Sequence, residues 1–87
     1  MTANSTLDRA ALDQPLEVLG LHGADAPADW TRWLSEIGFT TGEAVTVKAR
    51  AWPGGDPLVV RVGASTFALR AAEAACVLVR PAQGEAA

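Results

Sequence analysis

Few residues of this 87-residue chain could carry chemistry. His22 is the only histidine, Cys76 the only cysteine and Lys48 the only lysine. Acyl transfer needs a nucleophile beside an imidazole base, and no Gly-x-Ser-x-Gly sequence is present. A phosphate-binding loop needs a lysine directly after its glycines, whereas Lys48 lies apart from Gly54 and Gly55. The ten carboxylates are dispersed, with no pair spaced for acid–base work. We therefore expect a protein that is not an enzyme.

Metal chemistry has one candidate position. Transition-metal sites usually take several Cys or His ligands, and this chain has one of each, far apart in sequence. His22 lies near Asp25, and the two could supply half of an Fe²⁺ or Zn²⁺ site at a homodimer interface, where symmetry doubles every ligand. The alternative is that His22 is a solvated loop residue and Cys76 a small apolar strand residue. No other cofactor is predicted.

Residues 52–57 (WPGGDP) form the candidate contact surface. Trp52 follows a run that alternates apolar and polar residues, and Pro53 and Pro57 restrict the loop after it. Asp56 is suited to accept hydrogen bonds from nearby backbone amides. A large aromatic side chain on a restricted loop is typical of a protein–protein contact. The alternative is a hairpin loop whose tryptophan covers one end of the core.

Composition limits the class of protein. The chain has a net charge of −3, and its six arginines are scattered, whereas nucleic-acid binding needs clustered Lys and Arg. We therefore expect no nucleic-acid partner. A single cysteine fits a reducing compartment. No signal peptide is visible and no run approaches the ~20 apolar residues of a membrane span. These features predict a cytoplasmic protein without direct membrane insertion.

One helix and five strands are expected around the 52–57 loop. Apolar residues at i, i+3, i+4 and i+7 predict a helix over 27–37, ended by Gly38. Its apolar stripe, expected to be buried, consists of Trp30, Trp33, Leu34 and Ile37. Alternation predicts strands over 16–21, 45–51, 58–62, 65–69 and 76–80, with a single helical turn over 70–74. In the second strand the expected inward residues are Val45, Val47, Ala49 and Ala51.

These elements predict a mainly β fold, an SH3-like small β-barrel of about five strands with one α-helix inserted between strands 1 and 2. Curling one antiparallel sheet against the helix buries its apolar face and protects its edges. We expect three parts: a leader over 1–15 whose first six residues are frayed, the barrel domain over 16–81, and a disordered tail over 82–87.

Several short motifs in order resemble the FeoA family, whose members are small cytoplasmic proteins of bacterial ferrous iron transport. The motifs are residues 32–39 (RWLSEIGF), Gly42 with Val45 and Val47, residues 55–58 (GDPL), and residues 68–70 (ALR) followed by Glu73-Ala74. They cover about residues 16–80. Two departures are Thr41, where the family usually has proline, and Trp52, which replaces a more usual alanine before proline. The family fold is an SH3-like barrel.

The resemblance implies an accessory role beside FeoB, a membrane protein with a cytoplasmic GTPase domain that moves Fe²⁺. We expect this chain to dock on such a transporter and modulate uptake. By resemblance the candidate partner-binding residues are Trp52, Gly55, Asp56, Pro57 and Arg70. Two other functions remain open. One is that of an iron-linked transcriptional regulator module, because similar SH3-like domains stand at the end of iron-dependent transcriptional repressors. The other is a metal-binding dimer through His22 and Asp25.

Overall fold

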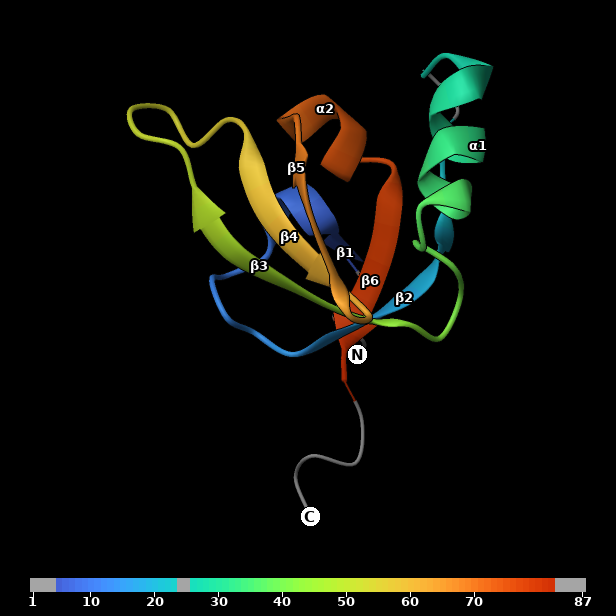
Figure 1. The fold of residues 1–87 in the computed structure, drawn as a ribbon, viewed down its shortest axis with the longest axis horizontal. Helices are drawn as coiled ribbons and strands as arrows, with labels where there is room; N and C mark the ends of the chain where they lie inside the picture. The colour runs from blue at the N-terminus through green and yellow to red at the C-terminus, as the bar shows by residue number, and fades with distance from the viewer. Residues whose placement is uncertain (1–4, 24–25, 83–87) are drawn as a thin grey trace.

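The computed structural model describes residues 5–23 and 26–82, and Figure 1 shows their arrangement. Within these residues, six strands, two short α-helices and one 3₁₀ helix follow each other. In order they are β1 (Ser5–Thr6), η1 (Leu7–Arg9), β2 (Leu16–Leu21), α1 (Ala28–Glu36), β3 (Ala44–Arg50), β4 (Leu58–Val62), β5 (Ser65–Leu69), α2 (Ala71–Ala74) and β6 (Val77–Pro81). The expected helix and all five expected strands are present.

The strands form one antiparallel sheet in the order β1-β6-β2-β3-β4-β5. The sheet curls around a single core, as Figure 1 shows, and the predicted SH3-like, mainly β fold is confirmed. The sixth strand was not expected. Ser5 pairs with Val79 and Thr6 with Leu78, so these two residues are not frayed as predicted. Residues 1–4 and 83–87 lie outside the described residues.

The core lies inside the curled sheet and consists almost entirely of aliphatic side chains. Leu7 of η1 is fully buried among the core residues. The other core residues are Ala10, Leu16, Val18, Leu34, Phe39, Val45, Val47, Leu58, Val60, Val62, Leu69, Ala74, Cys76, Val77 and Val79. In β4 the predicted alternation is confirmed, with Leu58, Val60 and Val62 inside and Arg61 outside.

In β3 the prediction is wrong at one end. Val45 and Val47 point inward, but Ala49 and Ala51 are exposed. The pairing with β4 shifts between Val47 and Ala49, and an extra residue in a strand reverses the faces that follow it. Arg50 consequently turns inward, and its guanidinium donates hydrogen bonds to the carbonyls of Asp8 and Ala10, both at 2.8 Å.

The helix α1 lies beside the sheet, next to β2, and covers less of the core than expected (Figure 1). Leu34 is fully buried, while Trp30 and Ile37 are partly buried against the core. Trp33 is 38% exposed, so the prediction that both tryptophans are buried is wrong for this one. The sequence period places four residues on one stripe, but a helix at the flank buries only the centre of that stripe.

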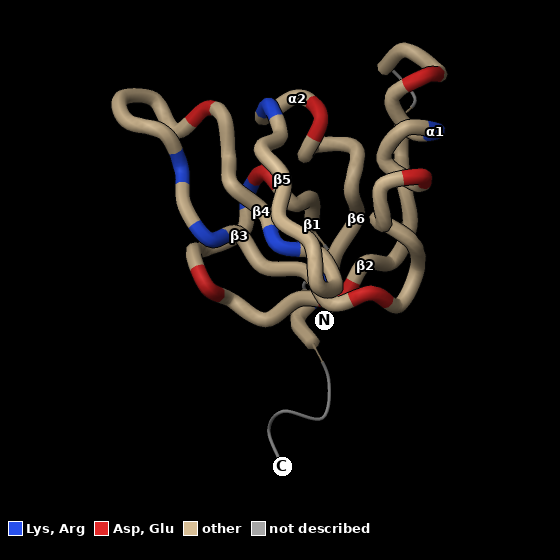
Figure 2. Tube along the Cα trace, in the orientation of Figure 1, with Lys and Arg blue, Asp and Glu red and all other residues tan. Residues whose placement is uncertain are grey.

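The end of α1 follows the prediction. Gly38 has a φ of 123°, which an L side chain rarely adopts, and the Phe39 amide bonds back to the Leu34 carbonyl at 3.0 Å. Neither described helix is long and apolar enough to cross a membrane. Acidic and basic residues are interspersed over the described chain, as Figure 2 shows.

Candidate functional site

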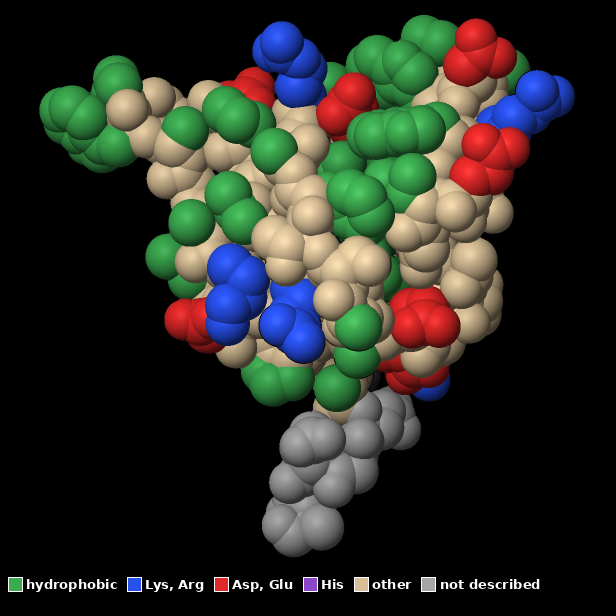
Figure 3. Space-filling view, viewed as in Figure 1, with side chains coloured by type: hydrophobic (Ala, Val, Ile, Leu, Met, Phe, Trp, Pro, Cys, Tyr) green, Lys and Arg blue, Asp and Glu red, His purple; other side chains and the backbone are tan. Residues whose placement is uncertain are grey.

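The loop over residues 51–57, between β3 and β4, extends beyond the barrel in Figure 1. We call it the Trp52 loop. Its tryptophan is 91% exposed, far more than the next large hydrophobic residue in the described part of the chain, Leu12, at 52%. In the space-filling view, hydrophobic side chains gather at the tip of this projection (Figure 3). The sequence-based alternative, a tryptophan that covers the end of the core, is therefore wrong.

Hydrogen bonds hold the base of the Trp52 loop. The amide of Ala51 donates to the carbonyl of Pro57 at 2.9 Å, and the amide of Gly55 donates to the carbonyl of Ala51 at 2.8 Å. Gly54 and Gly55 have φ values of 93° and 81°, a region open to glycine but strained for other residues. The loop therefore has a defined shape, although its tip is in water.

A side chain of the loop also reaches α2. Asp56 accepts a hydrogen bond at Oδ1 from the amide of Ala71 at 2.9 Å. This amide is one of the free donors at the start of the helix, which an acidic side chain commonly satisfies. Glu73 accepts from the amide of Arg70 at 2.8 Å and satisfies a second one. The structure thus brings Asp56 beside Arg70, two predicted contact residues far apart in sequence.

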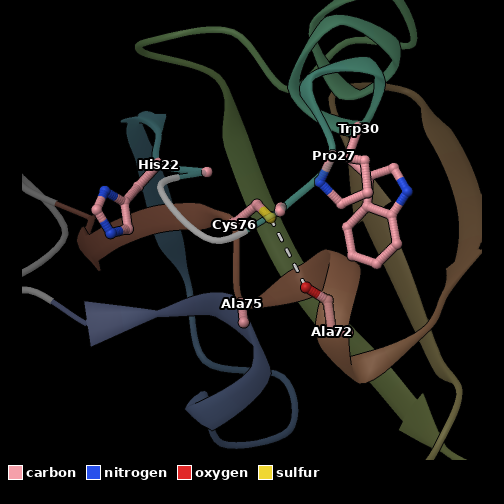
Figure 4. Close-up of a pocket in the computed structure, with 8 residues that line it drawn as sticks. His22, Pro27, Trp30, Ala72, Ala75 and Cys76 are labelled. Atoms are coloured by element: carbon pink, nitrogen blue, oxygen red, sulfur yellow. Dashed lines mark hydrogen bonds between the residues drawn. The ribbon is translucent and has the colours of Figure 1, made fainter.

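The structure contains a second feature that sequence reasoning missed. A groove of about 370 Å³ lies between the start of α1 and α2. Pro27 and Trp30 line it on the side of α1, and Ala72, Ala75 and Cys76 line it on the side of α2 and the turn that follows, as Figure 4 shows. We call it the α1–α2 groove. Its only sequence signal was Trp30, which the helical period assigned to the core.

Cys76 and His22 do not form a reactive pair. The Cys76 thiol donates to the carbonyl of Ala72 at 3.7 Å. Burial, and then the negative charges of Glu73 and Asp8, raise the pKa of this thiol above its ordinary value of 9.0, so it stays protonated at neutral pH. In Figure 4 the His22 ring lies at the far end of the groove from Trp30 and is turned away from it.

A metal site within one chain is not supported by this geometry. His22 is exposed, and no group of three or more His, Cys, Asp or Glu side chains that could hold a metal occurs among residues 5–23 and 26–82. Asp25, the other candidate ligand, lies outside the described residues. The arrangement of a projecting tryptophan, a restricted loop and an apolar groove is suited to binding another molecule.

Comparison with known proteins gives a consistent family. The model of the FeoA domain matches residues 5–81. A FeoA of Stenotrophomonas maltophilia, solved in complex with zinc, is 39% identical with a TM-score of 0.76, and the match covers 85% of this chain and 87% of that one. That protein is described as an SH3-domain protein with a suggested role as a ferrous iron transport activating factor.

More distant structures share the fold. A FeoA-like protein from Clostridium acetobutylicum is 25% identical with a TM-score of 0.78, and the match covers 93% of this chain and 90% of that one. A manganese-dependent transcriptional repressor is 18% identical with a TM-score of 0.78, and the match covers 94% of this chain but only 44% of the repressor. At that identity the likeness concerns the fold alone. Curated protein sequences gave no match.

Proposed function

Because this chain belongs to the FeoA family of non-catalytic accessory proteins, we propose that it modulates ferrous iron uptake by docking on the cytoplasmic GTPase region of a FeoB-like membrane transporter. The protein then works in the cytoplasm, without entering the membrane itself. Membership of the family supports a role in ferrous iron transport, and direct binding to the transporter is the part that we propose. The surface that we assign to the contact is the Trp52 loop with Arg70, which lies directly before α2.

The observation that supports this proposal most directly is the 91% exposure of Trp52 on a loop of defined shape. An indole can bury ~150–250 Å² of surface, and in the free protein most of the Trp52 side chain stays in contact with water. Tryptophan is also enriched among the few residues that dominate the binding free energy of an interface. A loop that is already ordered loses little conformational entropy when it binds.

The residues beside Trp52 suit the rim of such a contact. Asp56, through its bond to Ala71, fixes the loop against α2, and Arg70 is an exposed cation directly before that helix. Exposed charges at the edge of an interface mainly affect the association rate and the choice of partner. We therefore assign anchoring to Trp52, positioning to Gly55, Asp56 and Pro57, and charge selection to Arg70.

Calorimetric titration of the purified chain with the soluble GTPase region of the transporter tests the proposal. Trp52→Ala should weaken binding at least 10-fold, and up to about 30-fold if the side chain is a hot spot worth about 2 kcal/mol. The matched control is Leu12→Ala, which removes the next most exposed large hydrophobic side chain outside the loop and should leave binding unchanged. Arg70→Gln should slow association more than it changes dissociation.

Undiminished binding of Trp52→Ala would contradict the assigned surface, and no binding by the wild-type chain would contradict the partner. The same mixtures report GTP hydrolysis, because a modulator of the GTPase should change its rate when added in excess. A change that Trp52→Ala abolishes would tie modulation to the loop.

The zinc complex of the Stenotrophomonas protein favours a second candidate function, a metal-binding dimer. The described residues of one chain group no three ligands, and we place such a site between two copies, where symmetry doubles every ligand. Equilibrium dialysis with Fe²⁺ and Zn²⁺ tests it, with His22→Ala as the variant. Half a metal ion or more per chain, lost in His22→Ala, would support this function, and no retention by the wild-type chain would exclude it.

A further inference from the structure

The α1–α2 groove is a mainly apolar site outside the surface that we assign to the transporter contact. Among the described residues, those that line it include His22 but no Asp, Glu, Lys or Arg. The indole of Trp30 and the ring of Pro27 face the small side chains of Ala72 and Ala75 across it (Figure 4). Small residues opposite an aromatic wall leave space for a flat apolar group. A suitable occupant is therefore a large apolar group that is exposed on the molecule that carries it.

The same chain carries such a group. Trp52 is 91% exposed, and its indole would find the faces of Trp30 and Pro27 on one side of the groove and alanine methyl groups on the other. Aromatic pairs in offset or edge-to-face contact contribute ~0.5–1.5 kcal/mol beyond the buried area. The volume of about 370 Å³ falls within the ~300–1,000 Å³ range typical of ligand sites. We propose that the α1–α2 groove of one copy binds Trp52 of a second copy.

The contact must be between molecules. In Figures 1 and 3 the Trp52 loop projects away from α1, on the opposite side of α2 from the groove. The Asp56–Ala71 hydrogen bond and the two backbone hydrogen bonds at the base of the loop hold it in that direction. Trp52 therefore does not reach the groove of its own chain without loss of these bonds.

The Trp52 loop and the α1–α2 groove are different surfaces of the molecule, and this restricts how copies can associate. Two copies either exchange tryptophans reciprocally about a two-fold axis or associate head to tail. A single indole with its neighbouring prolines buries less than the ~1,200 Å² of a stable interface, so association is weak, with Kd on the order of 10⁻⁴ M. Since both copies carry a charge of −3, added salt should strengthen association by screening their repulsion.

Sedimentation equilibrium over about 10 µM to 1 mM protein measures this association, at a scale set by that Kd. The wild-type chain should shift from monomer toward larger species as its concentration and the salt concentration rise. Trp52→Ala removes the donor side chain, and Ala72→Leu fills the groove at an exposed helical position where leucine is well tolerated. Each variant alone should remain monomeric over the whole range.

An equimolar mixture of the two variants is the decisive sample. Trp52→Ala keeps an open groove and Ala72→Leu keeps a free tryptophan, so the mixture should associate and stop at a 1:1 complex. In this mixture, ¹⁵N-labelled Trp52→Ala should show chemical-shift changes at Trp30, Ala72 and Ala75. Trp33→Ala, which removes an exposed tryptophan of α1 outside the groove lining, should associate as the wild-type chain does.

Three results would overturn the proposal: a wild-type chain that is monomeric at 1 mM in high salt, association of Trp52→Ala equal to wild type, or a mixture that stays monomeric. Shifts at Trp30 and Ala72 caused only by the transporter's GTPase region would assign the groove to that partner instead. Because none of the self-association samples contains the transporter, this test stands or fails separately from the proposed function.

Discussion

The carboxylate of Asp56 lies 2.9 Å from the backbone nitrogen of Ala71 and accepts its hydrogen bond. This one bond joins the loop that carries Trp52 to the helix that forms a wall of the α1–α2 groove. Its two partners are fifteen positions apart in the chain, with β4 and β5 between them. This hydrogen bond therefore links the Trp52 loop to one wall of the α1–α2 groove within each molecule, and it is the first to test.

Asp56→Ala should destabilise the protein by about 0.5–2 kcal/mol, the usual cost of removing a side chain that satisfies a helix amide. Asp56→Asn keeps an oxygen acceptor and should retain most of that stability. Urea unfolding compares the three proteins, and amide exchange at Ala71 should accelerate only in the alanine variant. Equal stability of all three proteins would contradict a positioning role for Asp56.

Leu34 and Trp33 are neighbours on α1 with opposite burial. Leu34→Ala should cost about 2–5 kcal/mol, because it removes a fully buried side chain and leaves a cavity. Trp33→Ala should cost about 1–2 kcal/mol, because the indole is 38% exposed and only part of its area is removed from water. Urea unfolding of both variants measures the difference. A larger loss for Trp33→Ala would restore the sequence-based expectation of a tryptophan core.

Arg50 joins the chain before β2 to the strand that leads into the Trp52 loop. Arg50→Met keeps the apolar stem but removes the hydrogen bonds to Asp8 and Ala10, and should cost about 1.5–3 kcal/mol. The matched control is Lys48→Met, which removes an exposed ion pair with Asp13 at 2.9 Å and should cost about 1 kcal/mol or less. Urea unfolding measures both. Equal effects would mean that the Arg50 bonds add nothing beyond a surface charge.

Elements with a local cause could be predicted from the sequence. The alternation of β4 and the end of α1 at Gly38 each depend on a few neighbouring residues, and both are present. The two-residue strand β1 could not be predicted, since Ser5 and Thr6 have no pattern of their own and are strand only through pairing with β6. The irregularity in β3 likewise depends on its register with β4.

Some features of the candidate site could also be predicted from the sequence, and others could not. The composition of the loop predicted an exposed Trp52 as one of two alternatives, because proline and glycine act on the chain locally, and its role in a contact stays a prediction. The hydrogen bond from Ala71 to Asp56 joins a loop to a later helix, and no local pattern encodes it. The groove requires the end of β2, α1, α2 and the turn before β6 to meet in space. The helical period assigned Trp30 and Trp33 to one stripe but did not give the distance of α1 from the core.

Stability should fall in alkali through Cys76. The folded state raises the pKa of this thiol above 9.0, first by burial and then through the charges of Glu73 and Asp8. The contribution of the buried thiol is therefore complete below pH 9.0 and is lost as the pH rises through the folded pKa, because the unfolded chain releases its proton first. Urea unfolding at pH 8 and pH 10 under reducing conditions should show this loss.

The variant that isolates the thiol is Cys76→Ala. It should be less stable than the wild-type chain at pH 8, but its stability should fall less between pH 8 and pH 10. Lys48 and the arginines are common to both proteins, so the difference between the two slopes belongs to Cys76. Parallel slopes would contradict a shifted thiol.

Filling the groove should separate the two proposed uses of Trp52. Ala72→Leu leaves the tryptophan free and removes the site that competes for it, so at low protein concentration it should bind the transporter's GTPase region as tightly as the wild-type chain. At about 1 mM, well above a Kd on the order of 10⁻⁴ M for self-association, wild-type copies would occupy one another's tryptophans. Calorimetric titration should then give a weaker apparent affinity for the wild-type chain and an unchanged one for Ala72→Leu. Loss of transporter binding by Ala72→Leu at low concentration would instead mean that the groove itself contacts the transporter, and the two surfaces would act together.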